Sequence, residues 1–410
     1  MARLSNEPLA SRSIANAVPS AAPSNETASA RSGEHRKQGY GVDPVHKYGL
    51  MAPRFWHGMT PDAFWRLAHR GGYRFSVRGV ATAAAITGVG LGHWAGEAVQ
   101  SLLHRKRIER VRLDQAPLFV LGHWRSGTTL LHELLIRDTR NTFPTTYQCF
   151  APKHFLVTED WLPGLTRWLL PNKRPMDNMP AGWDRPQEDE FALCSLGVPT
   201  PYMSWAFPDQ GPVYREWLTL DVSDEDRRRW AAALQRFVHT VALRRQGRVV
   251  LKSPPHTARV KTLLEIFPEA RFVHIARDPL SLFPSTVRLW KSLSDVQSLG
   301  PARQRYDWIE EEVLANLNAM YKAYERDLPL IPAGRLAELR YEDLIADPQA
   351  QMRNVYNTLD LPGFEDAERA INAYFAAQRE YKTNRFELPA EVQERVNQRW
   401  QGYAKRFGYQ

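Results

Sequence analysis

The chain has 410 residues, of which 43% are hydrophobic and 24% charged, and its formal net charge is +9. This length and composition allow one large α/β domain with appendages, or two domains. The two cysteines, Cys149 and Cys194, exclude a disulfide framework and have no metal-ligand spacing, which indicates a reducing compartment. The positive charge suits an anionic ligand, nucleic acid or an anionic membrane; because the sequence has no zinc-finger or RNA-binding motif, we expect no nucleic-acid partner.

The first 40 residues are rich in Ala, Ser, Pro and Asn and contain almost no large apolar side chains. Such a segment cannot bury enough surface to offset its ordering entropy, so we expect residues 1–40 to be disordered. No charged start precedes an apolar stretch, so a secretory signal is not expected. The prediction is a cytoplasmic protein, with membrane association as an open alternative.

Residues 41–113 are predicted to form a helical region. Within it, the stretch from Gly79 to Gly96 carries no formal charge, and basic residues stand on both sides: Arg78, His104, Arg105, Lys106, Arg107 and Arg110. Its length is at the lower limit for a membrane span, and its residues are only weakly apolar. Three interpretations remain open, namely a helix packed against the protein, an element on a membrane surface, and a span.

A strand, a loop of small residues and a helix follow one another after residue 113. Residues 117–121 form a short apolar run that predicts a buried strand, and Gly122 ends it. Leucines then recur at helical spacing, at Leu130, Leu131, Leu134 and Leu135. The loop between strand and helix is a typical anion site, because unpaired backbone N–H groups and the helix dipole converge there.

Gly122 and Gly127 have the spacing of the G-x-x-x-x-G-K-[ST] phosphate loop, but Thr128 stands where the lysine belongs. A cation is present two positions before the second glycine, as Arg125. The guanidinium of Arg125 and the hydroxyls of Ser126, Thr128 and Thr129 suit a smaller terminal group, with no metal expected. The alternative is an ordinary glycine turn that caps a helix.

The run Arg125-Ser126-Gly127-Thr128-Thr129 resembles the 5′-phosphosulfate loop of the sulfotransferase family, [KR]-x-G-T-T, in its arginine-bearing form. The resemblance implies transfer of a sulfuryl group from 3′-phosphoadenosine 5′-phosphosulfate (PAPS) to an acceptor hydroxyl or amine. It assigns these five residues to donor binding.

A second phosphate site is predicted further along the chain. Residues 271–276 form a predicted strand, and Asp278-Pro279 begins a predicted helix, so Arg277 stands at the strand end. Ser285 follows eight residues later, which resembles the arginine and serine of the family's 3′-phosphate site. An arginine binds phosphate through two parallel hydrogen bonds, and a serine adds a donor. The alternative is a solvated arginine beside a helix-capping Asp278.

Two further segments resemble the family. In Y-E-D-L-I-A-D-P, the resemblance places Tyr341 near the adenine, and in Y-K-T-N-R-F it directs Lys382 and Arg385 toward the 3′-phosphate. The resemblance runs from about Leu118 to Tyr409. It implies an α/β fold for residues 114–410, with a P-loop-like central parallel sheet flanked by helices.

Sulfuryl transfer depends on positioning and on positive charge beside the departing phosphate. Arg125 is the first candidate to stabilise that charge, and Lys252, at the end of the predicted strand 248–251, is the second. A base must also take the acceptor's proton. We prefer His256 to Glu188 for this role, because relatives carry a histidine near the matching lysine, although here it is displaced by two positions; Glu190 is a third candidate.

The acceptor is expected to be a small molecule, a lipid or a glycan. An aromatic and proline-rich stretch from Phe143 to Phe207 indicates loops above the donor site and mildly favours an apolar acceptor, although most of these rings are expected in the core. An ATP-dependent P-loop kinase and a non-catalytic nucleotide-binding or membrane scaffold are the alternatives. The sequence predicts no oligomeric state.

Overall fold

The computed structural model describes residues 53–170, 181–301, 306–377 and 386–409. Their strands form one five-stranded sheet in the order β2-β3-β1-β4-β5, and every neighbouring pair is parallel. The strands are β1 (Leu118–Leu121), β2 (Asn141–Thr142), β3 (Arg248–Lys252), β4 (Arg271–Ala276) and β5 (Leu336–Arg340). The predicted strands and the predicted α/β class with a central parallel sheet are confirmed.

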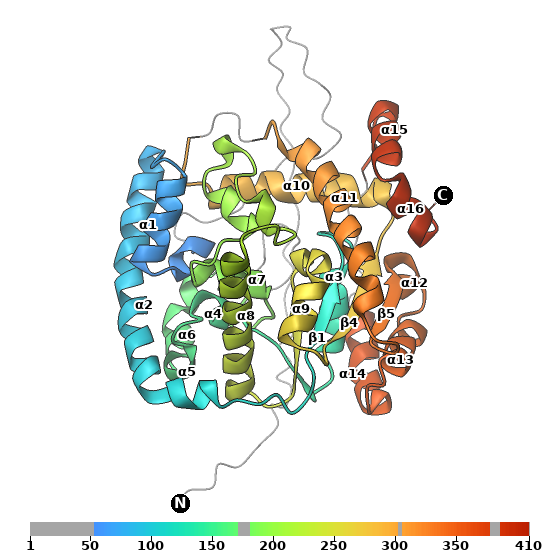
Figure 1. Cartoon of the computed structure of the whole chain (residues 1–410), viewed down its shortest axis with the longest axis horizontal. Coiled ribbons are helices and arrows are strands. Elements are labelled where there is room, and N and C mark those ends of the chain that lie inside the picture. Colours follow the sequence, from blue (N-terminus) through green and yellow to red (C-terminus); the bar gives the residue numbers. More distant parts are fainter. Residues whose placement is uncertain (1–52, 171–180, 302–305, 378–385, 410) are drawn as a thin grey trace, which may run out of the picture. The chain divides into compact units, whose positions relative to one another are not determined.

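The sheet is buried on both faces, because alternate strand residues join two separate parts of the core. Phe119 and Leu251 point to one face, and Leu118 and Val250 to the other. The first face is covered by α7 (Asp189–Ser195), α8 (Asp224–Arg244), α9 (Val260–Ile266), α10 (Pro279–Gln297) and α11 (Ile309–Asp327). The second is covered by α3 (Thr128–Leu135), α12 (Tyr341–Ala346), α13 (Pro348–Thr358) and α14 (Phe364–Ala377). Figure 1 shows α12 and α13 beside β5.

Short helices replace the long loops that the prolines between residues 143 and 207 predicted. They are α4 (Thr146–Phe150), α5 (Phe155–Thr158), α6 (Leu162–Thr166), η2 (Arg167–Leu169), η3 (Pro201–Ala206) and, just beyond, η4 (Pro208–Gln210). Prolines at the first turns of α6, η3 and η4 start these helices, since a helix start needs no N–H at that position. The remaining elements are η1 (Phe55–Gly58), η5 (Arg215–Trp217), η6 (Pro254–Ala258), η7 (Leu328–Leu330), α15 (Ala390–Arg399) and α16 (Gln401–Phe407).

The neutral stretch 79–96 lies inside one long helix, α2 (Val77–Glu109), which packs beside α1 (Pro61–Arg70) (Figure 1). Ser76 caps α2 by accepting a hydrogen bond from the Gly79 amide at 3.0 Å. Gly90 lets the helix approach the chain before α1, because a Cβ at this position would lie 2.9 Å from the Met59 carbonyl oxygen. Among the described residues, no helix has both the length and the apolarity that crossing a membrane requires.

In the described fold, burial lowers the pKa of four histidines from 6.5 to about 4: His57, His123, His154 and His274. The ring of His274, for example, is stacked between Tyr324 and Phe407 and bonds the Tyr321 hydroxyl at 2.8 Å. A neutral imidazole is therefore held in surroundings that disfavour its charged form.

These histidines predict a loss of stability in mild acid. Below pH 6.5 the unfolded chain takes up protons that the folded state refuses until about pH 4, so the free energy of unfolding falls as the pH decreases across this window. Each histidine contributes at most about 1.4 kcal/mol per pH unit. Urea unfolding at a series of pH values measures the effect, and a constant free energy of unfolding from pH 6.5 to 4.5 would contradict it.

Candidate active site

The loop between β1 and α3 has the backbone of an anion-binding turn. Gly122 and Gly127 have φ angles of +143° and +108°, and Arg125 between them has a φ of +69°. A Cβ on Gly127 would lie 2.5 Å from Cδ2 of Tyr341, so the second position needs glycine both for its φ and for space. The Gly122 amide donates to the Thr257 hydroxyl at 2.8 Å, which ties the loop to η6.

The two predicted phosphate sites meet. Arg125 Nε donates to Ser285 Oγ at 3.1 Å, and Arg277 Nη1 donates to the Arg125 carbonyl oxygen at 2.9 Å. The Arg277 guanidinium also lies over the Tyr341 ring, 4.4 Å from its centroid. Since 152 residues separate Arg125 from Arg277, the fold itself brings these groups together.

The hydroxyls of the loop lie where the sequence placed them. Ser126 and Thr128 are buried, and Thr129 is half-buried at the start of α3. Ser126 Oγ is buried and has no hydrogen-bond partner within the described part of the chain. A buried hydroxyl without a partner is costly, so this atom is suited to a ligand in the loop. Lys382 and Arg385 lie outside the described residues.

Lys252 ends β3 and points at the sequence candidate Glu188. Its Nζ lies 2.6 Å from Glu188 Oε1, and the second carboxylate oxygen accepts from the Tyr202 hydroxyl. Burial, and then the charge of Glu188, raise the pKa of Tyr202 well above its usual value, so the phenol remains a donor. Trp124 Nε1 in turn donates to the Tyr202 oxygen at 3.0 Å. Trp124 belongs to the phosphate loop, so this chain of contacts links the loop to Lys252.

His256 lies elsewhere than the base role requires. Its side chain is fully buried, and Nε2 lies 2.6 Å from Asp189 Oδ2. Burial raises the pKa of Asp189, but the charge of His256 and hydrogen bonds from His256 and Ser253 outweigh burial and lower it overall. The preference for His256 over Glu188 therefore receives no support from this geometry, because an acceptor would have to reach a ring that solvent cannot.

Glu190, the third candidate, is also fully buried. It forms a two-pronged ion pair with Arg259, at 2.7 and 3.0 Å, and Arg259 lies over the Trp230 ring. Arg259 further donates to the carbonyl oxygens of Trp217 and Leu218. Three consecutive acidic residues thus bond three different basic side chains: Glu188 with Lys252, Asp189 with His256, and Glu190 with Arg259.

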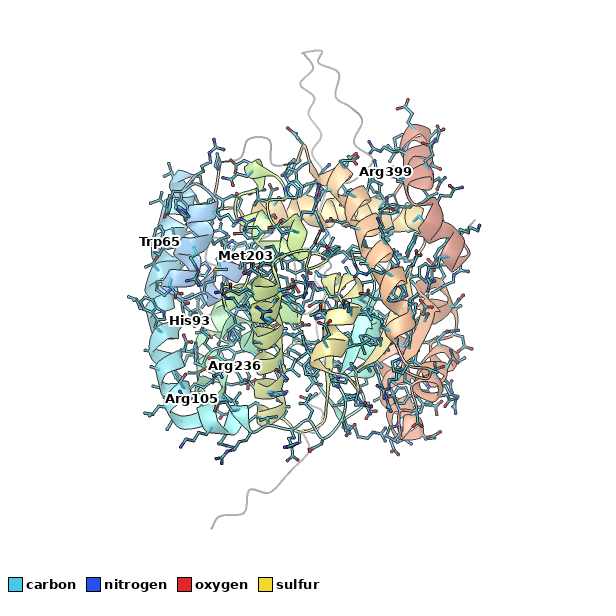
Figure 2. All side chains as sticks on the ribbon, in the orientation of Figure 1. Trp65, His93, Arg105, Met203, Arg236 and Arg399 are labelled. Atoms are coloured by element: carbon cyan, nitrogen blue, oxygen red, sulfur yellow. The ribbon has the colours of Figure 1, made fainter. Side chains whose placement is uncertain are left out.

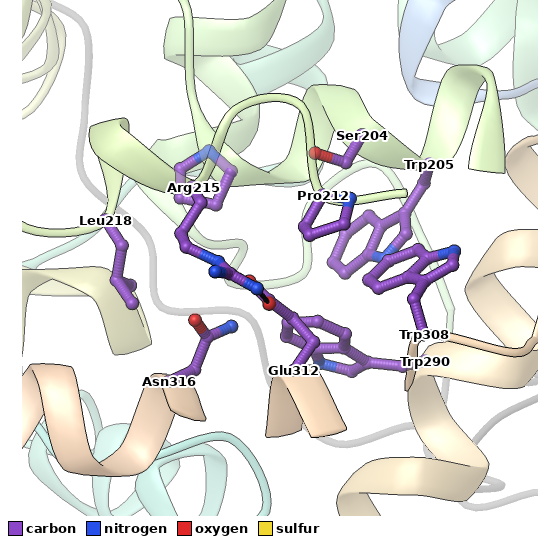
Figure 3. Close-up of a pocket in the computed structure, with 10 residues that line it drawn as sticks. Ser204, Trp205, Pro212, Arg215, Leu218, Trp290, Trp308, Glu312 and Asn316 are labelled. Carbon is purple, nitrogen blue, oxygen red and sulfur yellow. Dashed lines mark hydrogen bonds and ion pairs between the residues drawn. The ribbon is translucent and has the colours of Figure 1, made fainter. Parts of the chain in front are cut away.

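A small pocket lies close to this network (Figure 3). Trp205, Trp290 and Trp308 line it, together with the ion pair of Arg215 and Glu312. Trp290 contacts Trp124 edge-on, with ring centroids 5.3 Å apart. Trp205 packs on Tyr202 at 4.6 Å. The pocket is therefore one ring away from the carboxylate that Lys252 and Tyr202 hold.

Sequence reasoning missed several residues of this site. Trp124 was visible as an aromatic residue inside the phosphate loop, and Tyr202 as one member of the aromatic stretch, but neither had a signal for its role. The pairing of Arg259 with Glu190 and of Asp189 with His256 had no such signal, because the partners are 69 and 67 residues apart, respectively.

Comparison with known proteins agrees with this geometry. The sulfotransferase family model matches residues 117–366. Omega-hydroxy-beta-dihydromenaquinone-9 sulfotransferase Stf3, from both Mycobacterium bovis and Mycobacterium tuberculosis, is 38% identical over 373 residues, which covers 89% of this chain and 94% of the relative.

Two solved structures share the fold. Sulfotransferase STF9 from Mycobacterium avium has a TM-score of 0.63 at 20% identity, covering 85% of this chain and 97% of that one. Sulfotransferase STF1 from Mycobacterium tuberculosis H37Rv has a TM-score of 0.58 at 17% identity, covering 86% and 94%. The chain belongs to the sulfotransferase family and is an enzyme of that class, not the ATP-dependent kinase that the glycine spacing alone also allowed.

Proposed function

We propose that this enzyme transfers a sulfuryl group from PAPS to the hydroxyl group of a lipid-like acceptor. The observation that carries the proposal is the meeting of two basic strand ends, Arg125 after β1 and Arg277 after β4, with Ser285 bonded to Arg125. A donor that carries an anionic group on its 3′ side as well as its 5′ side requires such a pair of sites. A nucleoside triphosphate requires only one.

The residues at the two sites suit PAPS. Arg125, the buried Ser126 hydroxyl, Thr128, Thr129 and the amides around Gly127 would hold its 5′-phosphosulfate. Arg277 and Ser285 would hold the 3′-phosphate, and Tyr341, already against Gly127 and Arg277, would contact the adenine. Lys382 remains a predicted contact.

PAPS supplies an activated sulfuryl group whose release leaves negative charge on a phosphate. The protein's part is to place fixed positive charge where that negative charge grows. Arg125 in the loop and Lys252 at the end of β3 would do this. Lys252 is only 4% exposed, so its charge acts through a medium that screens it less than water does.

Glu188 is proposed as the base instead of His256. Its side chain is 16% exposed, whereas those of His256 and Glu190 are fully buried. Lys252 and Tyr202 fix its carboxylate in one orientation, from which it would accept the acceptor's hydroxyl proton. Lys252 would then contact both the base and the phosphate group that departs.

The acceptor assignment rests on the pocket and on the relatives. Three tryptophans give the pocket an apolar wall within one ring of Tyr202. The name of the relative that is 38% identical gives a hydroxylated dihydromenaquinone, a lipid, as its acceptor. A hydroxylated isoprenoid lipid therefore suits this enzyme better than a glycan.

The test is transfer of label from ³⁵S-PAPS to a panel of hydroxylated prenyl quinones, short alcohols and glycans, with products identified by mass. We expect the prenyl quinones to gain one SO₃ group most efficiently. Transfer only to glycans would overturn the assignment of a lipid acceptor. A melting temperature that 3′-phosphoadenosine 5′-phosphate does not raise would overturn the assignment of PAPS as the donor.

Arg277→Ala is expected to weaken donor binding about 10- to 100-fold, because it removes charge-assisted hydrogen bonds to the 3′-phosphate. Titration with 3′-phosphoadenosine 5′-phosphate, followed by calorimetry or thermal shift without magnesium, measures this. Arg353→Ala is a matched control, since that arginine pairs with Glu368 on α14. Wild-type affinity in Arg277→Ala would remove Arg277 from the donor site.

A further inference from the structure

The outward face of α2 has the opposite polarity to that of a normal surface helix. From Val80 to Leu103, every exposed residue is apolar or glycine. The largest are Val80, Val89, Leu91, Trp94, Val99, Leu102 and Leu103, and Leu102 is 85% exposed. A surface helix of a globular protein normally turns such residues toward the core.

The polar residues of the same stretch point inward and are used there. His93 bonds the His154 ring at 2.7 Å and the His57 carbonyl oxygen at 2.8 Å. Glu97 pairs with Lys153, and Gln100 accepts from the Leu156 amide. The helix is thus fixed by its polar face and leaves an apolar face about 36 Å long, at 1.5 Å per residue, toward its surroundings.

Basic residues border this face at both ends. Arg78 is exposed before it, and Arg105, Lys106, Arg107 and Arg110 are exposed after it. The acidic residues nearby are paired: Glu109 with Arg105, and Asp62, which accepts from the Trp94 indole at 3.1 Å, with Arg66. Figure 2 shows Trp65 and Arg105 at the same edge of the described fold as His93 of α2.

We propose that the outward face of α2 docks on the surface of an anionic lipid bilayer, with the helix parallel to the membrane plane. The apolar residues would enter the acyl boundary, Trp94 would lie at the headgroup level, and the basic ends would meet anionic headgroups. A second copy of the chain fits this face less well. Paired in either direction, two α2 helices would bring positive ends together.

The proposal goes beyond the function proposed above and is tested without donor or acceptor. The full chain is sedimented with vesicles of phosphatidylcholine alone and with equimolar phosphatidylcholine and phosphatidylglycerol. We expect binding to the anionic vesicles, weakened by added salt. Leu102→Glu should weaken it about 10-fold or more, because a leucine that would enter the acyl boundary is replaced by a charge that anionic lipid repels.

Ile345→Glu is the matched control, since Ile345 is 41% exposed on α12, at the opposite edge of the described fold from α2 (Figure 1), and its binding should equal that of the wild type. Circular dichroism and thermal unfolding of both variants verify their folding. Three outcomes would overturn the proposal: wild-type protein that stays in the supernatant with anionic vesicles, equal losses in both variants, or a dimer in light scattering that Leu102→Glu dissociates.

Discussion

Replacing Lys252 by methionine is expected to lower kcat by about 10²- to 10³-fold, the effect of removing one fixed charge from a developing anion. Methionine keeps most of the side-chain volume but leaves Glu188 without the cation that lies 2.6 Å away. Because the donor's phosphate groups are assigned to Arg125 and Arg277, donor affinity should change far less than kcat. Single-turnover transfer of ³⁵S, together with donor titration, separates the two quantities.

Lys261→Met is the control for this variant. Lys261 is exposed at the start of α9, so its charge can be removed without disturbing the site. An unchanged kcat in Lys252→Met, with the donor still bound, would exclude Lys252 from the reaction.

Replacing Glu188 by glutamine is expected to lower kcat by about 10²- to 10⁴-fold, the usual contribution of a general base. Glutamine still accepts from Tyr202 but cannot take the acceptor's proton. His256→Gln should behave differently. It disturbs a fully buried partner of Asp189, so it should lower the free energy of unfolding. The kcat of the folded variant should stay near that of the wild type.

The comparison between the two variants discriminates the two candidate bases. Each is assayed for kcat at saturating donor and acceptor, and the folded fraction is determined by donor binding. If folded His256→Gln loses more kcat than Glu188→Gln, then the histidine is the base, and the proposal for Glu188 is wrong.

The sequence predicted the strands because their signals are local, and the donor-site candidates rest on equally local signals. A glycine spacing, an arginine at a strand end and a serine one helical stretch later each lie within about ten residues. The parallel sheet then brings strand ends to one edge, so the meeting of Arg125, Ser285 and Arg277 follows from topology.

The surroundings of the two candidate bases could not be predicted in the same way. His256 lies four residues after Lys252, which placed it near the reaction in sequence, but η6 turns its ring into the core toward Asp189. Glu188 is 64 residues from Lys252, and only tertiary packing brings them together. For α2, the neutral stretch was ambiguous because its average hydropathy combines two faces that the fold separates.

The three acidic residues at 188, 189 and 190 bond basic side chains at 252, 256 and 259 in matching order. One row is a helix start, and the other is a strand end followed by η6. Inserting or deleting a single residue within either row would move every later pair out of register. The buried acidic side chain of each such pair would then lose its basic partner. Length in these two segments is therefore constrained more tightly than the identity of most residues within them, and natural variation here should take the form of substitutions.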